Sequence, residues 1–195
     1  MEGISLLQAK TLTTDLNTIY WLQQNGFQLV ETEITFALEF AKFSEKPTAC
    51  ECRIAGQADV AALKKLVGTV FPNTRFRPPY FSQAENQRFY AKWIENAVNG
   101  EFDDLCLIAE QNGKLQGTIS LRFNGNTAKI GLLAVVPEFQ RQGIAKRLLS
   151  AAILHVQHHN AENLHITTQL SNIAAISLYQ SLGATIFETN YWFYR

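Results

Sequence analysis

The sequence predicts an α/β fold: a mixed sheet with helices on both faces, preceded by a small N-terminal helix–strand subdomain. Two observations predict it. Strand-like apolar runs alternate along the chain with segments in which apolar residues recur every three or four positions, as in amphipathic helices. Of the 195 residues, 47% are apolar and 17% are charged, which suffices for a large core and excludes a disordered chain.

A domain boundary is predicted at residues 44–49 (SEKPTA), where charges and a proline interrupt the apolar pattern. The sequence therefore divides into a small α/β subdomain over residues 1–45 and a main domain over residues 46–195. In the subdomain, a helix is expected after the capping residue Asp15, and Gly26 ends it. The alternating residues 28–38 follow as a strand.

The main domain is predicted to continue with strands and helices in a mixed order. Asn-Gly pairs separate its three central strands, and such pairs are the strongest short signal for hairpins, so we expect an antiparallel meander there. The predicted elements are a strand at 50–55, helices at 57–70 and 83–98, strands at 104–110, 115–123 and 128–136, a helix at 143–159, a strand at 164–169, a helix at 172–182 and a strand at 184–195.

Two segments of the chain are alike. Gly26–Phe36 reads GFQLVETEITF and Gly183–Phe193 reads GATIFETNYWF, and both follow a helix that contains leucine and glutamine. One interpretation is the duplication of a structural unit. The other is chance, because two amphipathic helix–glycine–strand units often share such a pattern.

Charge and composition exclude several classes of partner. Seventeen basic and seventeen acidic residues cancel, so no global field attracts nucleic acid or an anionic membrane. No apolar run reaches the length of a membrane span, and the first residues lack a secretory signal, so we expect a cytoplasmic protein. Cys50 and Cys52 are interpreted as strand residues, and no metal site is expected.

The segment VVPEFQRQGIA (135–145) joins an apolar strand to the long helix and carries the chemical signal. The first amides of a helix are unpaired and the helix dipole is positive there, a combination that binds phosphate or pyrophosphate. Arg141, Lys146 and Arg147 add positive charge. Neither the nucleotide-hydrolysing P-loop pattern nor a Rossmann glycine pattern is present.

This strand, the motif Val-x-Pro-x-x-Gln-x-x-Gly-x-Ala and the helix resemble the acyl-CoA motif of the GNAT N-acetyltransferases. The resemblance implies acetyl-CoA as co-substrate, with its pyrophosphate held by the loop and its pantetheine arm bound to the amides of Leu133 and Val135 like an added strand. It also implies that Asn172 touches this arm and that Tyr179 lies near the sulfur. The implied cofactor-binding residues are Leu133, Ala134, Val135, Gln140, Arg141, Gln142, Gly143, Ile144, Ala145, Lys146, Asn172 and Tyr179.

Residues 75–108, together with NGFQLVETEITFAL, LHITTQLSNIAAISLYQSLGA and NYWFYR, resemble one branch of this family. That branch acetylates the amino group of dTDP-4-amino-4,6-dideoxygalactose during enterobacterial common antigen synthesis. The resemblance covers roughly residues 20–195. Because the branch usually has a longer N-terminal portion, we expect part of the N-terminal subdomain to be missing or replaced.

The resemblance implies two catalytic residues. Tyr179 would be the general acid that protonates the departing thiolate, and Glu31 would be the base that removes the amine proton through water. A sugar ammonium cannot attack the thioester until it loses a proton, and a carboxylate can relay that proton. The alternative for Tyr179 is an aromatic residue packed under the last strand, and the alternative for Glu31 is a solvated strand residue.

The proline-bounded loop around Phe76 is the candidate acceptor site. Arg75 and Arg77 suit the diphosphate of a nucleotide sugar, because guanidinium groups bind phosphate oxygens in pairs. Tyr80 could stack on thymine or sugar. The alternative is an exposed basic loop with no ligand.

The sequence therefore predicts direct acetyl transfer in a ternary complex to a nucleotide sugar. Two alternatives stay open: a GNAT enzyme for another small amine or a protein amine, and a non-catalytic acyl-CoA-binding module. Neutralising Arg75 and Arg77 should weaken only a phosphate-bearing acceptor. The aromatic C-terminus (191–194) is expected either in the sheet or at the interface of a homodimer.

Overall fold

The structure, a computed structural model, describes residues 6–40 and 52–195. Its contacts group the chain into two compact units, one made of residues 1–38 and 166–195 and the other of residues 39–165. The boundary predicted at residues 44–49 lies outside the described residues. The first unit therefore combines the two ends of the chain, which the predicted division at residue 45 had kept apart.

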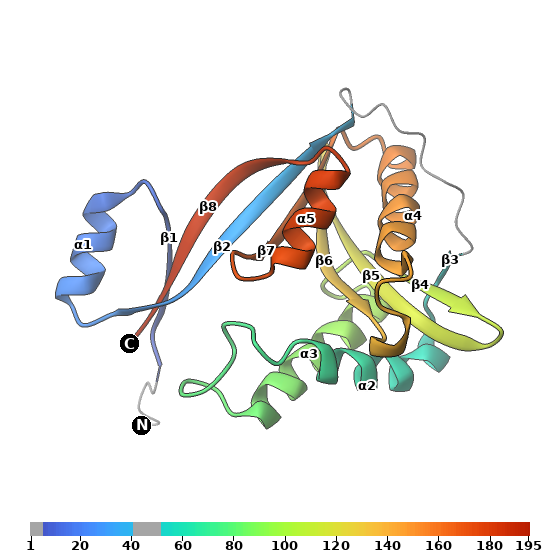
Figure 1. Ribbon diagram of the computed structural model, residues 1–195, viewed down its shortest axis with the longest axis horizontal. Coiled ribbons are helices and arrows are strands. Elements are labelled where there is room, and N and C mark those ends of the chain that lie inside the picture. The colour runs from blue at the N-terminus through green and yellow to red at the C-terminus, as the bar shows by residue number, and fades with distance from the viewer. Residues whose placement is uncertain (1–5, 41–51) are drawn as a thin grey trace. The chain divides into compact units, whose positions relative to one another are not determined.

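The predicted α/β class is confirmed (Figure 1). Among the described residues, the strands pair in the order β1-β8-β2-β7-β6-β5-β4-β3. The sheet is mixed, because β7 pairs with β6 in parallel while the meander strands are antiparallel. β7 serves both units: its residues up to His165 belong to the second unit and the rest to the first.

The first unit holds two helices and strands from both ends of the chain. β8 lies between β1 and β2 and is antiparallel to both. The sequence did not predict β1, because its five residues (QAKTL) are mostly exposed and leave no apolar alternation to detect. The elements are β1 (Gln8–Leu12), α1 (Leu16–Gln24), β2 (Gln28–Glu39), β7 (Asn163–Gln169), α5 (Ile173–Ser181) and β8 (Thr185–Tyr194).

The ladder between β2 and β8 is nearly symmetric about the pair Glu33–Asn190. When Gly26 is aligned with Gly183, Gln28 corresponds to Thr185 and Ala37 corresponds to Tyr194. The pair Gln28–Tyr194 at one end of the ladder therefore corresponds to the pair Thr185–Ala37 at the other end. The register slips once on each strand, after Leu29 and after Ile186, which are equivalent under the same shift. The two strands therefore share even their irregularities.

The turns before these strands obey the same equivalence. Gly26 and Gly183 end their helices with φ of 78° and 81°, a conformation that favours glycine. The amide of Thr13 donates to the Thr189 carbonyl at 3.1 Å, and at the equivalent place Leu170 donates to Thr32 at 2.9 Å. Because register, turn and strand entry all repeat, the structure favours duplication of a strand–helix–strand unit over chance likeness.

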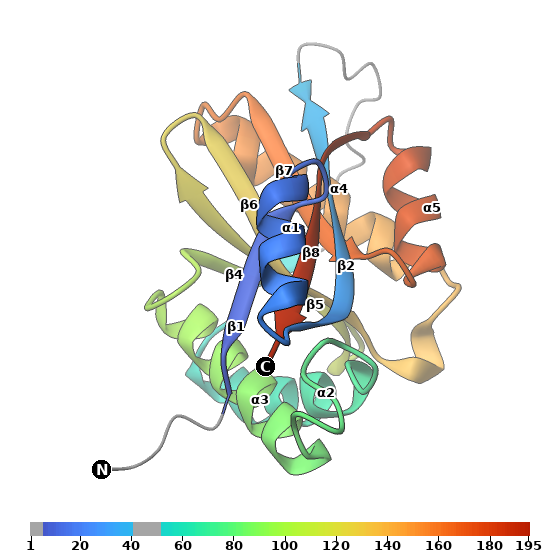
Figure 2. The same ribbon diagram turned by 90° about the vertical axis from the view of Figure 1, so that its left-hand side faces the viewer.

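Both helices of the first unit cover one face of its strands (Figure 2). Phe193 of β8 packs against Ile19 and Leu22 of α1. At the equivalent place the ring of Phe36 in β2 meets the ring of Tyr179 in α5, with centroids 5.8 Å apart. Phe193 and its neighbour Tyr194 are fully buried, so this part of the C-terminus packs within the sheet.

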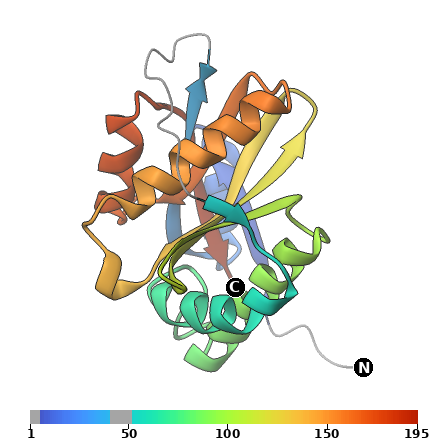
Figure 3. The same cartoon turned by 90° about the vertical axis from the view of Figure 1, so that its right-hand side faces the viewer.

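The second unit is a three-layer arrangement (Figure 3). α4 covers one face of the meander and α2 and α3 cover the other, where Leu63, Ile94 and Ile108 form part of a closed apolar core. The expected hairpins are present, since β4, β5 and β6 pair in antiparallel order. The elements are β3 (Cys52–Ile54), α2 (Val60–Val70), α3 (Gln83–Asn99), β4 (Leu105–Gln111), β5 (Lys114–Asn124), β6 (Thr127–Val135) and α4 (Ile144–His158).

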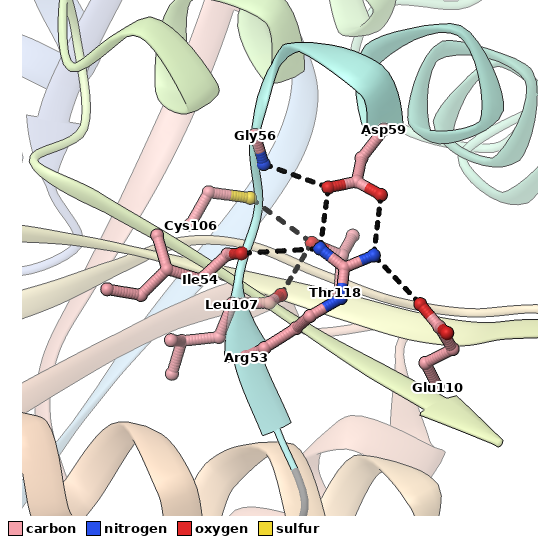
Figure 4. Close-up of polar contacts among 8 residues, drawn as sticks. All are labelled: Arg53, Ile54, Gly56, Asp59, Cys106, Leu107, Glu110 and Thr118. Carbon is pink, nitrogen blue, oxygen red and sulfur yellow. Dashed lines mark hydrogen bonds and ion pairs between the residues drawn. The ribbon is translucent and has the colours of Figure 1, made fainter. Parts of the chain in front are cut away.

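A polar network ties the short strand β3 to its neighbours (Figure 4). The Arg53 guanidinium donates to both carboxylate oxygens of Asp59 at 2.8 Å and to Glu110 at 2.8 Å. Asp59 also accepts the Gly56 amide at 2.8 Å, which closes the 3-10 turn Gln57–Asp59 that precedes α2. Arg53 holds the pKa of Asp59 at about 2, well below its usual range. Because Arg53 is half-exposed, we expect this network to add about 1 kcal/mol of stability at most.

The cysteines of the described residues are free thiols. Cys106 is buried in β4, and burial raises the pKa of its thiol to about 11, so it stays protonated and unreactive. Cys52 lies in β3, and Cys50 lies outside the described residues. Within the described residues, no helix has the length and apolar character of a membrane span.

Candidate active site

The loop between β6 and α4 has the backbone of an anion site. A short 3-10 turn at Pro137–Phe139 leads into it, and Arg141 and Gly143 take positive φ angles of 61° and 80°. α4 has no side-chain cap, and its first backbone bond runs from the Arg147 amide to the Gly143 carbonyl at 3.0 Å. The amides of Ile144 and Ala145 precede that bond, so they stand at the positive end of the helix dipole.

Two glutamine side chains of this loop hydrogen-bond to its own backbone. The Gln142 side chain donates to the Glu138 carbonyl at 2.9 Å, and the Gln140 side chain donates to the Val135 carbonyl at 3.4 Å. The glutamines therefore bind their own loop backbone. They hold the turn in which the exposed amides lie, a role that the sequence motif alone did not specify.

The edge of β6 offers backbone groups next to this loop. The Val136 amide donates to the Gln116 carbonyl of the β5 side at 2.9 Å, and the Leu132 amide also points to β5. Because strand amides alternate between edges, those of Leu133 and Val135 point to the opposite edge. β7 pairs with β6 only as far as Lys129 in the described chain, so this edge is available for an extended ligand.

Tyr179 is 5% exposed, and its ring lies against Phe36. Among the described residues no group hydrogen-bonds its hydroxyl, and burial alone raises the pKa of Tyr179 to about 12. The phenol therefore keeps its proton throughout the neutral range. The predicted packing under the strands and the predicted acid role are compatible, because the ring is packed while the hydroxyl has no hydrogen-bond partner in the described part of the chain.

Asn172 caps α5. Its side-chain oxygen accepts the Ala175 amide at 3.2 Å, and its amide nitrogen donates to Thr168 at 3.2 Å. Asp15 does the same at the start of α1: it accepts the Thr18 amide at 3.1 Å and binds Thr11 at 3.5 Å. Because the equivalent residue of the other copy has this structural role, capping accounts for a polar residue at position 172 without a cofactor.

Glu31 lies on the face of β2 opposite the two helices of its unit, and its carboxylate accepts the Thr32 amide at 3.0 Å. Other acidic and polar groups share this face. Glu33 forms an ion pair with Lys10 and accepts the Trp192 indole at 2.9 Å, and Glu188 accepts the Asn190 amide group at 2.6 Å. Glu188 is the equivalent of Glu31 under the duplication, so the unit holds two glutamates in matched places.

The loop before α3 is held in place by hydrogen bonds from a side chain of that helix. The buried Asn86 donates to three oxygens of the loop: the carbonyls of Phe71 and Phe76 and the hydroxyl of Thr74. No sequence signal marks Asn86, because a polar residue on a helix is normally solvated. This anchor gives the loop a defined conformation.

The two loop arginines differ in their surroundings. The Arg77 guanidinium donates to the Thr74 carbonyl at 2.9 Å and thereby braces the loop itself. The Arg75 guanidinium lies 4.0 Å from the centre of the Phe76 ring. Both side chains and Tyr80 are half-buried, so the loop is not the freely solvated basic segment of the alternative interpretation.

The predicted residues fall into two groups. The residues of β6, the loop and α4 lie together in the second unit, as do Arg75, Arg77 and Tyr80. Glu31, Asn172 and Tyr179 lie in the first unit. Each group has the local geometry described above.

The model of the acetyltransferase (GNAT) family matches residues 62–184, which is more than half of the chain. The chain belongs to the GNAT family. It is thus an acetyltransferase that uses acetyl-CoA, and the fold and enzyme class predicted from the sequence are confirmed.

Relatives of this acetyltransferase include sugar-related proteins. It is 37% identical over 193 residues to dTDP-fucosamine acetyltransferase of Escherichia coli O6:H1, covering 98% of this chain and 82% of that protein. It is 26% identical to the spore coat polysaccharide biosynthesis protein SpsD of Bacillus subtilis, covering 100% and 68%. A GNAT acetyltransferase structure from Colwellia psychrerythraea superposes with a TM-score of 0.70 at 16% identity, covering 96% and 64%, and shows the fold alone.

The burial of Tyr179 determines how easily an acid at position 179 could protonate a thiolate. A thiol has a pKa near 8.5, so a phenol with a pKa of about 12 gives up its proton to a solvated thiolate only at a cost of about 5 kcal/mol. A thiolate that leaves beside the same buried ring is desolvated too, which raises its own pKa and narrows the gap. A proton transfer from an acid at position 179 would therefore need a site that excludes water.

Proposed function

We propose that the acetyltransferase moves an acetyl group from acetyl-CoA to the 4-amino group of dTDP-4-amino-4,6-dideoxygalactose by direct transfer in a ternary complex. The observation that carries the proposal is the 37% identity to dTDP-fucosamine acetyltransferase over 98% of the chain. The reaction would belong to enterobacterial common antigen synthesis and take place in the cytoplasm, where acetyl-CoA is made. No metal is part of the proposal.

The cofactor side of the mechanism uses the second unit. The positive start of α4 and its amides bind the pyrophosphate, with Arg141 and Lys146 as additional charges. The pantetheine arm extends along the open edge of β6, where the outward amides of Leu133 and Val135 donate to its carbonyls. The side chain of Ala134 between them is buried in the apolar core of the second unit. Most of the rate enhancement should come from holding amine and thioester together.

The proton transfers are assigned to the first unit. Glu31 takes a proton from the sugar ammonium through water, and the free amine attacks the thioester carbonyl. When the carbon–sulfur bond breaks, Tyr179 gives its proton to the thiolate, and the products are the amide and coenzyme A. Asn172 supports this side as the cap of α5, and its contact with the cofactor arm stays a prediction.

The acceptor side uses the loop before α3. The guanidinium of Arg75, stacked on Phe76, presents its edge to a diphosphate, and Tyr80 offers a ring for the thymine or sugar. Arg77 is bound to the loop backbone, so its contribution to phosphate binding is shared with a structural role. The loop is preorganised by Asn86, which reduces the entropy cost of binding.

The test is thiol release from acetyl-CoA with three acceptors: the dTDP-amino sugar, the same sugar without its nucleotide, and a peptide with a free N-terminus. Fast release with the dTDP-amino sugar alone supports the proposal. Release with the peptide instead would favour a protein acceptor. If acetyl-CoA binds but no acceptor stimulates release, the acceptor assignment is wrong or the protein is a binding module.

Variants divide the proposal into its parts. Tyr179→Phe should lower kcat by about 100-fold, in the range of general acid catalysis, while coenzyme A still binds. Glu31→Gln should lower kcat, whereas Glu188→Gln, its equivalent in the other copy, should not. Equal losses of kcat would mean that any charge change on this face of the strands disturbs the enzyme.

Arg75→Gln should raise KM for the dTDP-amino sugar, with the exposed Arg88→Gln on α3 as control. A homodimer stays a prediction that light scattering would check.

A further inference from the structure

The second unit contains a fully buried carboxylate that the mechanism above does not use. Asp103 is 0% exposed and lies just before β4. One of its oxygens accepts the Trp93 indole at 3.0 Å and the Ser120 hydroxyl at 2.6 Å, and the other accepts the Arg122 guanidinium at 2.8 Å. Burying a carboxylate is costly even with these partners, so its position needs an explanation.

The partners of Asp103 lead to the cofactor strand. Ser120 lies on β5, and while its hydroxyl donates to Asp103, its oxygen accepts the Leu132 amide of β6 at 2.9 Å. This contact is a side-chain bond at a place where a regular ladder would have a backbone bond. Trp93 lies on α3, which follows the candidate acceptor loop.

The contact lies at an irregularity in β6. Ile119 pairs with Leu133 and Leu121 pairs with Ile130, so the single residue Ser120 faces two residues, Gly131 and Leu132. This is a β-bulge, and a bulge shifts the alternation of a strand by one residue. It therefore decides that the amides of Leu133 and Val135, rather than that of Ala134, point to the open edge.

Gly131 shows how closely the carboxylate approaches the bulge. A Cβ atom at position 131 would lie 2.1 Å from a carboxylate oxygen of Asp103 and 2.7 Å from the Ser120 hydroxyl. No side chain fits there without moving Asp103. Carboxylate, hydroxyl and bulge are thus one closely packed arrangement.

We propose that Asp103 and Ser120 are positioning residues that fix the bulge of β6 and thereby aim the amides of Leu133 and Val135 at the pantetheine arm. The proposal rests on the proposed place of that arm along β6. Ser120 satisfies the amide that the bulge takes out of the ladder, and Asp103 holds the hydroxyl in the one orientation that leaves its oxygen free to accept. The pair touches neither substrate nor cofactor.

The test compares two buried hydroxyls on the same strand. Ser120→Ala removes the hydroxyl that faces β6, whereas Thr118→Val removes one that donates to the Leu107 carbonyl of β4 at 2.9 Å. Both changes should lower the melting temperature. Ser120→Ala should also weaken coenzyme A binding by about tenfold in calorimetry, as loss of well-aimed hydrogen bonds predicts, and Thr118→Val should leave it within twofold.

A ligand without pantetheine isolates the strand from the loop. 3′-Phosphoadenosine 5′-diphosphate carries the phosphates of coenzyme A but cannot reach β6, so Ser120→Ala should bind it as the wild type does. Equal affinity of Ser120→Ala and wild type for coenzyme A would overturn the proposal. So would equal weakening of both ligands, or the same loss in Thr118→Val, since either result means general loosening.

Two further variants keep the test decisive. If Ser120→Ala does not fold, Asp103→Asn keeps the shape but turns one acceptor into a donor, and it should show the same selective loss. Ser120→Thr retains the hydroxyl and should restore coenzyme A affinity. If the wild type binds 3′-phosphoadenosine 5′-diphosphate as tightly as coenzyme A, the arm does not use β6, and the proposed cofactor site fails rather than its positioning.

Discussion

Tyr179 and Leu22 occupy equivalent places in the two copies of the strand–helix–strand unit, and each is buried against a phenylalanine of the facing strand. Only position 179 carries a hydroxyl. Since the scaffold is satisfied by leucine in one copy, the phenol of the other is not required for packing. The hydroxyl is therefore the feature that distinguishes position 179 from its equivalent in the other copy.

The pH dependence of the reaction follows from the raised pKa of Tyr179. A pKa of about 12 means that the phenol stays protonated across the working range, so an acid at this position should give no alkaline decline in kcat below pH 10. The contribution of the neutral phenol to the free energy of unfolding is present below its ordinary pKa near 10 and is lost as the pH rises through 12. A profile of kcat against pH from 6 to 10 tests the expected absence of an alkaline decline. A decline near pH 8 that vanishes in Tyr179→Phe would contradict it.

Most elements could be predicted because each carries its own signal. The helix from Leu16 follows a capping residue, and the hairpins of the meander are marked by Asn-Gly pairs, so local physics identified both. β1 carried no apolar alternation. Ser120 and Asp103 are separated by seventeen residues and meet only through strand pairing, so no short motif reveals them.

The loop before α4 allows a prediction with a matched control. Gly143 and Gly125 both have positive φ, 80° and 59°, and both have open space where a Cβ would go. Gly143→Ala and Gly125→Ala should therefore each cost about 1–2 kcal/mol of unfolding free energy, because the strain is in the backbone. Urea unfolding would measure this cost.

The two glycine variants should differ in ligand binding. Gly143 precedes the amides proposed to bind the pyrophosphate, so Gly143→Ala should weaken coenzyme A by about tenfold. Gly125 lies in the hairpin between β5 and β6, and its variant should bind coenzyme A normally. If calorimetry gives both variants the same affinity, the loop is not the phosphate site.

At the scale of the whole molecule, sequence reasoning found the class but divided the chain along its length. It placed residues 1–45 in one subdomain, yet β8 inserts between β1 and β2, so the two chain ends form one unit. The likeness between Gly26–Phe36 and Gly183–Phe193 was the available signal. It showed that the segments are alike but could not show that they pair, because pairing depends on distant contacts.

The duplication predicts different roles for the two equivalent helices, α1 and α5. Leu22 is 3% exposed and packs under Phe193, so Leu22→Ala should lower the free energy of unfolding by about 3 kcal/mol. Leu16→Ala, at a position 56% exposed on the same helix, should cost less than about 1 kcal/mol. Because α1 of the first copy has no assigned chemistry, kcat of Leu22→Ala should stay within twofold of wild type well below its melting temperature. Tyr179→Phe should show the opposite pattern, with a small loss of stability and a large loss of kcat. Urea unfolding and thiol-release assays on all three variants measure both quantities, and a loss of kcat in Leu22→Ala as large as in Tyr179→Phe would mean that α1 takes part in the chemistry.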